Sequence, residues 1–155
     1  MTPKSFRSEV IDPTLKLLDL YSSSASNLLL GTALVESGLT YRKQIGGGPG
    51  RGLFQIEPAT FHDVYGRYLR IRARLLERVN SLCSKDGTAP VDQLYTNDRL
   101  GCAIARLRYR YAKEPLPDAW DAEGLARYHK KYYNTALGKT DLSKSIEAFK
   151  IAQSA

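Results

Sequence analysis

Long hydrophobic runs are missing from this sequence. Apolar stretches such as Leu28–Leu30 are short, and none approaches the roughly 18 consecutive apolar residues that a membrane-spanning helix needs. At the N-terminus, Lys4 and Arg7 are followed by acidic residues and not by the apolar core of a signal peptide. We therefore expect no membrane span and no export signal.

Cysteine and histidine are also scarce. Cys83 and Cys102 lie far apart without a Cys-x-x-Cys motif, and His62 and His129 are remote from both in the sequence. A zinc site is therefore not expected, and nothing else in the sequence calls for a metal or a cofactor. Two free thiols are typical of a protein made in a reducing cytosol, and a disulfide formed after release is the alternative.

The chain has enough apolar residues for a core and a clear excess of positive charge. Its 155 residues, 43% of them apolar and 25% charged, fit one globular domain over residues 1–155. With 23 basic and 16 acidic side chains, the net charge is +7. A positive surface attracts polyanions, so nucleic acid, anionic lipid and bacterial wall polymer are all candidate partners.

Helix signals are frequent along the chain. Apolar residues at helical spacing, prolines at first-turn positions and capping residues predict helices over about 13–22, 27–36, 58–65, 68–80, 97–111, 118–132 and from about 141, with a loop over 84–96. The capping signals are Asp12 before the first helix, one of the serines at 22–24 or Ser26 before the second, Gly38 after the second, and Asn97 before the fifth. Residues 40–57 lose this periodicity and contain five glycines between positions 46 and 52. We expect a mainly α fold of the α+β kind, a single helical domain with a small glycine-rich loop or hairpin wing.

One predicted helix carries a row of arginines. Arg67, Arg70, Arg74 and Arg78 recur at steps of three and four residues, which places them on one face of a helix. Such a row is usually a solvated cationic face, and contact with an anionic partner is the alternative.

Glu36 ends a predicted helix whose preceding residues are nearly all apolar. A carboxyl group at this place lies at the edge of the core, where burial and the C-terminal end of the helix dipole both disfavour its charged form. A carboxyl group that holds its proton is what a general acid needs. Taken alone, the same position also fits an ordinary surface glutamate on the last turn of a helix.

The residues around Glu36 form a recognisable motif. Glu-Ser-Gly at 36–38 is followed by Gly-Arg-Gly-Leu-Phe-Gln-Ile-Glu-Pro-Ala-Thr at 50–60. This pair resembles the lysozyme-like superfamily, and within it the soluble lytic transglycosylase group, whose hallmarks are Glu-Ser-Gly, then Gly-Leu-Met-Gln and Pro-x-Thr. Weaker resemblance at 97–105 and 126–129 extends the match over about residues 26–133.

The resemblance implies an activity and a set of site residues. Glu36 would be the catalytic acid and base that cleaves the β-1,4 bond between N-acetylmuramic acid and N-acetylglucosamine in peptidoglycan, without metal or cofactor. Lytic transglycosylation to a 1,6-anhydro product is the expected outcome, and hydrolysis by the same acid is the alternative. The residues expected to contact the substrate are Ser37, Gln55, Glu57 and Tyr128.

Three positions depart from the family pattern. Glu57 stands where the family usually has an apolar residue, so it is either a second carboxylate that activates water or a charge that favours the start of a helix. His129 replaces the family asparagine, and Phe54 replaces the more usual methionine.

Short, basic and leaderless members of this group are typical of bacteriophages. The resemblance therefore implies a monomeric endolysin or virion-associated enzyme, made in the host cytoplasm and acting at the bacterial wall after release or delivery by a virion. A basic nucleic-acid-binding protein and a structural virion protein are the competing classes. Nucleic acid is the less favoured partner, because no helix-turn-helix, zinc-finger or RNA-recognition signature is present.

Overall fold

The structure is a computed structural model that describes residues 1–133 and 141–155. The helical elements are α1 (Pro3–Phe6), η1 (Arg7–Ile11), α2 (Asp12–Leu17), α3 (Ser23–Ser37), α4 (Pro58–Asp63), η2 (Val64–Tyr68), η3 (Leu69–Ile71), α5 (Ala73–Asn80), α6 (Pro90–Gln93), α7 (Asp98–Tyr109), α8 (Ala122–Tyr132) and α9 (Leu142–Ser154). The described residues contain no β-strand. The mainly helical prediction is thus confirmed. The glycine-rich wing is a loop held by two isolated antiparallel bridges, Lys43 with Arg51 and Arg51 with Ile56.

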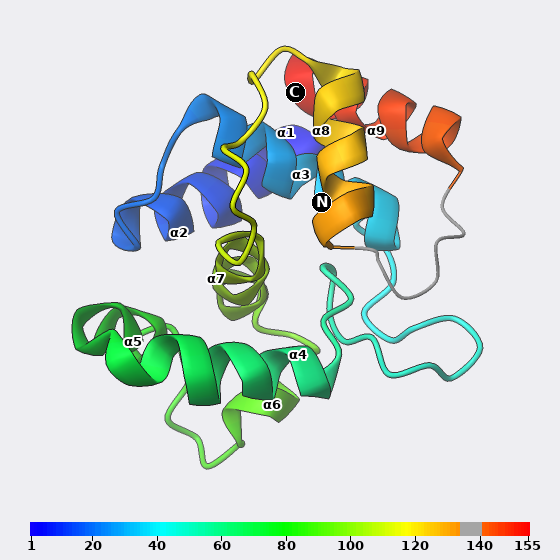
Figure 1. Ribbon diagram of the computed structural model, residues 1–155. Coiled ribbons are helices and arrows are strands. Elements are labelled where there is room, and N and C mark those ends of the chain that lie inside the picture. Colours follow the sequence, from blue (N-terminus) through cyan, green and yellow to red (C-terminus); the bar gives the residue numbers. More distant parts are fainter. Residues whose placement is uncertain (134–140) are drawn as a thin grey trace.

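The helices form two layers joined by α7 (Figure 1). The first layer contains α1, α2, α3, α8 and α9, and the second contains α4, α5 and α6. Helix α7 runs between them, while the glycine-rich loop descends along one side from the end of α3 to the start of α4. The end of α3 therefore lies where the two layers and the loop meet.

Helix α3 begins at Ser23, four residues before the predicted start, and ends within one residue of its predicted end. Ser22 caps its start, with the side-chain oxygen accepting a hydrogen bond from the Ala25 backbone N–H at 3.0 Å, and Gly38 ends it in the left-handed region at φ 60°. Most of the helix is buried, because α9 and α8 pack against it. A methyl group on Gly31 would lie 2.1 Å from the Phe149 ring, so only glycine permits this close approach of α9.

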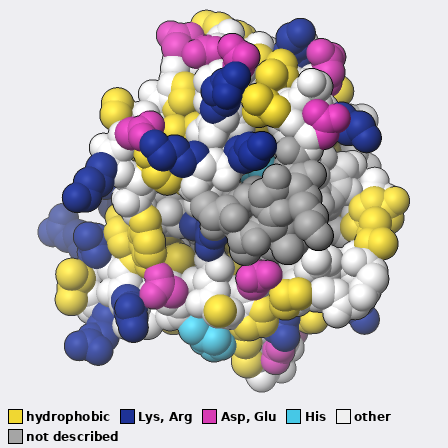
Figure 2. All heavy atoms as spheres, turned by 45° about the vertical axis from the view of Figure 1, so that its right-hand side comes forward, with side chains coloured by type: hydrophobic (Ala, Val, Ile, Leu, Met, Phe, Trp, Pro, Cys, Tyr) yellow, Lys and Arg dark blue, Asp and Glu magenta, His cyan; other side chains and the backbone are white. Residues whose placement is uncertain are grey.

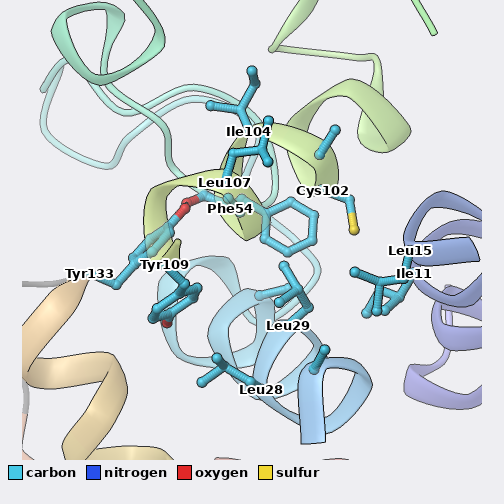
Figure 3. Close-up of a cluster of buried hydrophobic side chains, with 14 of the residues drawn as sticks. Ile11, Leu15, Leu28, Leu29, Phe54, Cys102, Ile104, Leu107, Tyr109 and Tyr133 are labelled. Atoms are coloured by element: carbon cyan, nitrogen blue, oxygen red, sulfur yellow. The ribbon is translucent and has the colours of Figure 1, made fainter. Parts of the chain in front are cut away.

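Phe54 anchors the glycine-rich loop in the core. Its ring lies among Leu29 of α3 and Leu107 of α7 (Figure 3), with only 1% of the residue exposed. The Phe6 ring packs against it with 5.8 Å between ring centres. Burying a side chain of this size contributes about 1.5–3 kcal/mol, which fixes the loop segment that precedes α4.

The N-terminal helix differs from its prediction. It begins at Pro3 and not near residue 13, because Thr2 caps it and α1, η1 and α2 follow one another without a break. Asp12 consequently lies inside the helical segment and does not cap it. The segment stops at Leu17, before the predicted residue 22, and Asp19 turns the chain in the left-handed region at φ 58°.

The predicted helix over 68–80 is interrupted. Helix α4 continues through η2 and η3, and the helical backbone then breaks at Arg72, with φ −127° and ψ 72°. The Arg72 guanidinium turns back, donating to the Tyr68 carbonyl at 2.7 Å and lying 3.8 Å from the centre of its ring. Because of this break, the predicted row of arginines is divided between two helical segments instead of following one continuous face.

The four arginines of that row are nevertheless exposed, as a solvated face requires. Dark-blue basic side chains gather toward the left of the face drawn in Figure 2, on the side where Figure 1 places α5. Among the described residues, the row has one ion pair, between Arg67 and Asp63 at 3.6 Å. This part of the surface is therefore strongly cationic.

The remaining helices begin near their predicted positions. Asn97 caps α7 by accepting from the Leu100 N–H at 3.1 Å, and Asp121 caps α8, three residues after its predicted start. A short helix, α6, interrupts the loop expected over 84–96, with Pro90 in its first turn. None of the helices among the described residues is long and apolar enough to cross a membrane.

Candidate functional site

A cleft with a volume of about 330 Å³ opens where the end of α3, the glycine-rich loop and α4 meet α7 and the end of α8. Its walls are formed by Glu36, Tyr41, Gln44, Ile45, Gln55, Ile56, Glu57, Thr60, Arg108 and Tyr133. The predicted site residues Glu36, Gln55 and Glu57 thus come together around one cavity, although up to twenty-one positions separate them in the sequence.

Glu36 is hydrogen-bonded to a histidine that the solvent does not reach. Its Oε2 lies 2.8 Å from Nε2 of His129 on α8, and the exposed fractions of the two side chains are 15% and 0%. His129 Nδ1 is buried and makes no hydrogen bond in the part of the chain that the structure describes. A buried N–H without an acceptor is costly, so the arrangement favours the tautomer that carries its proton on Nε2 and donates it to Glu36.

Aromatic rings hold His129 in place. Its ring stacks on Tyr133 with 5.6 Å between centres, and it packs against Phe149 at 6.0 Å. The Tyr133 hydroxyl donates a hydrogen bond to the Phe54 carbonyl at 2.6 Å. Burial, and secondarily the charge of Glu36, raise the pKa of Tyr133 well above its usual range, so this hydroxyl keeps its proton. The histidine is therefore fixed between the core and the cleft.

Gln55 has an unusual backbone conformation at the cleft wall. Its φ of 50° lies in the left-handed region, which costs a non-glycine residue of the order of 1 kcal/mol. The side-chain Nε2 donates to the Gly52 carbonyl at 2.9 Å, and the residue lines the cleft. A methyl group on Gly50 would come within 2.7 Å of Gln55 Oε1, so glycine at 50 leaves room for this amide.

The structure does not bring Ser37 or Tyr128 into the cleft. The Ser37 hydroxyl is buried and donates to the Leu53 carbonyl at 2.7 Å, whereas the resemblance implies a contact with the substrate. Tyr128 is 5% exposed, and its hydroxyl donates to the Glu114 carbonyl at 3.0 Å. In this structure Ser37 ties the glycine-rich loop to α3, and Tyr128 ties α8 to the segment before it.

Glu57 lies at the rim of the cleft, immediately before α4. The residue is exposed, and its side chain makes no capping hydrogen bond to the helix. Its carboxylate therefore stands at the mouth of the cavity, near a helix N-terminus that favours negative charge. Both interpretations of this residue, a base in the cleft and a charge at a helix start, agree with this position.

Arg108 is a wall residue that the motif did not indicate. Its Nη1 donates to Thr60 Oγ1 at 2.8 Å and its Nη2 to the Tyr133 carbonyl at 3.1 Å. The sequence did contain a signal for it: position 108 continues the spacing of Leu100 and Ile104 on the inward face of α7. An arginine on an apolar helix face is a candidate for a site, because it must find polar partners inside the protein.

No group of three or more histidine, cysteine, aspartate or glutamate side chains in the described residues is placed to hold a metal ion. Cys83 and Cys102 are free thiols, half-buried and buried respectively. In comparisons with known proteins, no family model, curated protein or solved structure matches this chain.

Proposed function

We propose that the protein is a peptidoglycan-cleaving enzyme of the lysozyme-like, lytic transglycosylase type. The observation that carries the proposal is the carboxyl group of Glu36, which lines a cleft and is hydrogen-bonded from behind by buried His129. The motif residues Gln55 and Glu57 line the same cleft. A carboxyl group in this setting is suited to give and take a proton at a bound glycosidic bond.

The proposed reaction has two steps, both at Glu36. The protonated carboxyl group gives its proton to the glycosidic oxygen, and the bond from this oxygen to C1 of N-acetylmuramic acid breaks through an oxocarbenium-like transition state. The carboxylate then takes the proton of the 6-hydroxyl of the same sugar, whose oxygen bonds to C1 and forms the 1,6-anhydro ring. Donation from His129 Nε2 stabilises the carboxylate between the two steps.

Hydrolysis is the alternative outcome at the same site, and the observation behind it is that Glu57 also lines the cleft. Glu57 is a second carboxylate on the cleft wall and would activate a water molecule while Glu36 acts as the acid. Enzymes of this inverting kind separate the two carboxyl groups by roughly 6.5–9.5 Å to leave room for water. The product would then carry a reducing N-acetylmuramic acid in place of the anhydro sugar.

Mass spectrometry of the released fragments tests the proposal. Purified protein is incubated with peptidoglycan, and anhydro-muropeptides are expected, whereas fragments heavier by one water would assign hydrolysis. Glu36→Gln should abolish release. Glu123→Gln, which removes an exposed carboxylate from α8 far along the chain from the motif, is the matched control and should retain activity. Full activity of Glu36→Gln would refute the assignment of the acid.

A bacterial wall partner also implies a route to the wall. We propose that the enzyme acts as a monomer, either as a bacteriophage endolysin released at lysis or as a virion component that enters with the particle. The exposed arginines along η2 to α5 favour a second class, a basic nucleic-acid-binding or structural virion protein. Tight, salt-sensitive DNA binding without any soluble wall fragment would support that class over the enzyme.

A further inference from the structure

The cleft does not end at Arg108. A second hollow of about 350 Å³ shares Thr60 and Arg108 with the cleft and continues along α4 to Asp63 and Tyr111. A third, of about 440 Å³, shares Asp63 and Tyr111 with the second and reaches Arg67. We call these two adjoining hollows the α4 groove, which runs from Thr60 and Arg108 toward the cationic surface.

Arg108 stands at the junction of the cleft and the α4 groove, and no carboxylate in the described part of the chain neutralises its charge. Its hydrogen-bond partners, Thr60 Oγ1 and the Tyr133 carbonyl, are neutral, and no carboxylate lies within ion-pair distance of it among the described residues. Its buried Nε has no hydrogen-bond partner there. A half-buried cation of this kind has lost part of its hydration without gaining a counter-charge, so an anionic ligand would stabilise it.

The Arg108 guanidinium is also held rigidly. Two hydrogen bonds fix its Nη atoms, and its central carbon lies 5.4 Å from the centre of the Tyr133 ring. A planar guanidinium matches the two oxygens of a carboxylate, and little side-chain freedom remains to be lost on binding.

The surroundings of Arg108 determine how an acidic glycan would lie. Glu57 at the mouth of the cleft repels an anionic group from its side, and Asp63 in the α4 groove is paired with Arg67, so that such a group is directed toward Arg108. Tyr111, 47% exposed, offers an aromatic surface farther along the groove, where a sugar ring can pack. An aromatic surface near an arginine that has no carboxylate partner among the described residues fits a strand that carries an acidic group on some of its sugars.

We infer that Arg108 binds a carboxylate carried by the muramic acid unit of the substrate, at the junction of the cleft and the α4 groove. This rests on the proposed function and names its substrate class: an acidic amino-sugar strand, as opposed to neutral chitin. The carboxylate has two sources, the lactyl group itself in a strand without peptides and the stem peptide in an intact strand. Arg108 is thus a specificity-determining residue.

Binding measurements on the inactive Glu36→Gln protein test the inference without turnover. The probes are peptide-free tetrasaccharides with free or amidated lactyl groups, the same glycans bearing stem peptides with free or amidated carboxylates, and chitotetraose. Isothermal titration should show at least one free-carboxylate glycan binding roughly tenfold to a hundredfold more tightly than its amidated form, as a charge-assisted hydrogen bond provides. The pair that shows the difference identifies the source.

Variants of Arg108 complete the test. In the Glu36→Gln protein, the additional substitution Arg108→Gln should remove the preference for the free carboxylate. Arg108→Lys should keep part of this preference because the positive charge remains. The matched control is Arg127→Gln, which removes an exposed arginine of α8 that is paired with Glu123, and it should leave the preference unchanged. Equal binding of free and amidated glycans would overturn the inference alone, whereas failure of every glycan to bind would overturn the proposed function with it.

Discussion

Replacing His129 by leucine is the sharpest test of the arrangement around Glu36. The variant removes the donor that lies 2.8 Å from Glu36 Oε2, at a position where the histidine has no exposed surface. A hydrogen bond to a charged group contributes about 1.5–3 kcal/mol, and this one is strongest when Glu36 is a carboxylate. Because this hydrogen bond stabilises the carboxylate that forms in the first step, the kcat of the His129→Leu variant should fall roughly tenfold to a hundredfold.

The Michaelis constant KM should change much less than kcat, because His129 does not line the cleft. Release of muropeptides from purified peptidoglycan, followed over a range of substrate concentrations, separates the two. His129→Gln places an amide N–H near the lost Nε2 and should recover part of kcat. A His129→Leu protein that folds normally by circular dichroism and keeps kcat within twofold of the wild type would refute this role.

A measurement on the unmodified site tests the same geometry without any assay of activity. Nitrogen-15 NMR of the histidine rings should show His129 with the proton on Nε2 and a bare Nδ1. A proton on Nδ1 would contradict the direction of donation that we assign to the His129–Glu36 hydrogen bond, because buried Nδ1 has no acceptor among the described residues.

Three further predictions concern Ser37, Gln55 and the two cysteine thiols. Ser37→Ala leaves the Leu53 carbonyl without its donor and should lower the free energy of unfolding by about 1–3 kcal/mol in urea titrations; an unchanged midpoint would contradict this. Gln55→Gly relieves the left-handed backbone and should hold or raise thermal stability while activity on peptidoglycan falls, and retained activity would argue against a role for the amide. Burial raises the pKa of the Cys83 and Cys102 thiols, so that little of either is thiolate at pH 8. Iodoacetamide should therefore modify Cys83 slowly and Cys102 only in denaturant. Equal labelling of the two cysteines in the native protein would refute this.

Local signals in the sequence predicted those helices whose ends depend on neighbouring residues. Two such signals are capping residues: Ser22 before α3 and Asn97 before α7 accept hydrogen bonds from backbone N–H groups of their own helix. A third is Gly38, which ends α3 in the left-handed conformation. These effects depend on neighbouring residues alone, so they can be predicted without the tertiary structure. The start of the N-terminal helix was missed because Thr2 and Pro3 supply a cap upstream of the more obvious Asp12. The break at Arg72 follows from its contact with Tyr68, which helical periodicity alone does not reveal.

For the candidate site, too, the sequence predicted the position of some residues in the cleft and not of others. Glu36, Gln55 and Glu57 belong to a motif with a recognisable order, so the sequence alone identifies them, and the structure places them on one cleft. Ser37 and Tyr128 were also named from the motif. A sequence gives the type of a residue but not the orientation of its side chain. Both hydroxyls donate hydrogen bonds to backbone carbonyls of the protein and do not line the cleft.

The sequence by itself determined that this is a mainly helical chain with a cationic surface, a loop rich in glycine and a glutamate at the end of an apolar helix. These properties depend on composition and on residues a few positions apart. Only the tertiary structure decided that His129 bonds Glu36 and that Arg108 bonds Thr60 at the junction of the cleft and the α4 groove. Both contacts join helices distant in the sequence, and they form only when α8 and α7 pack beside the end of α3.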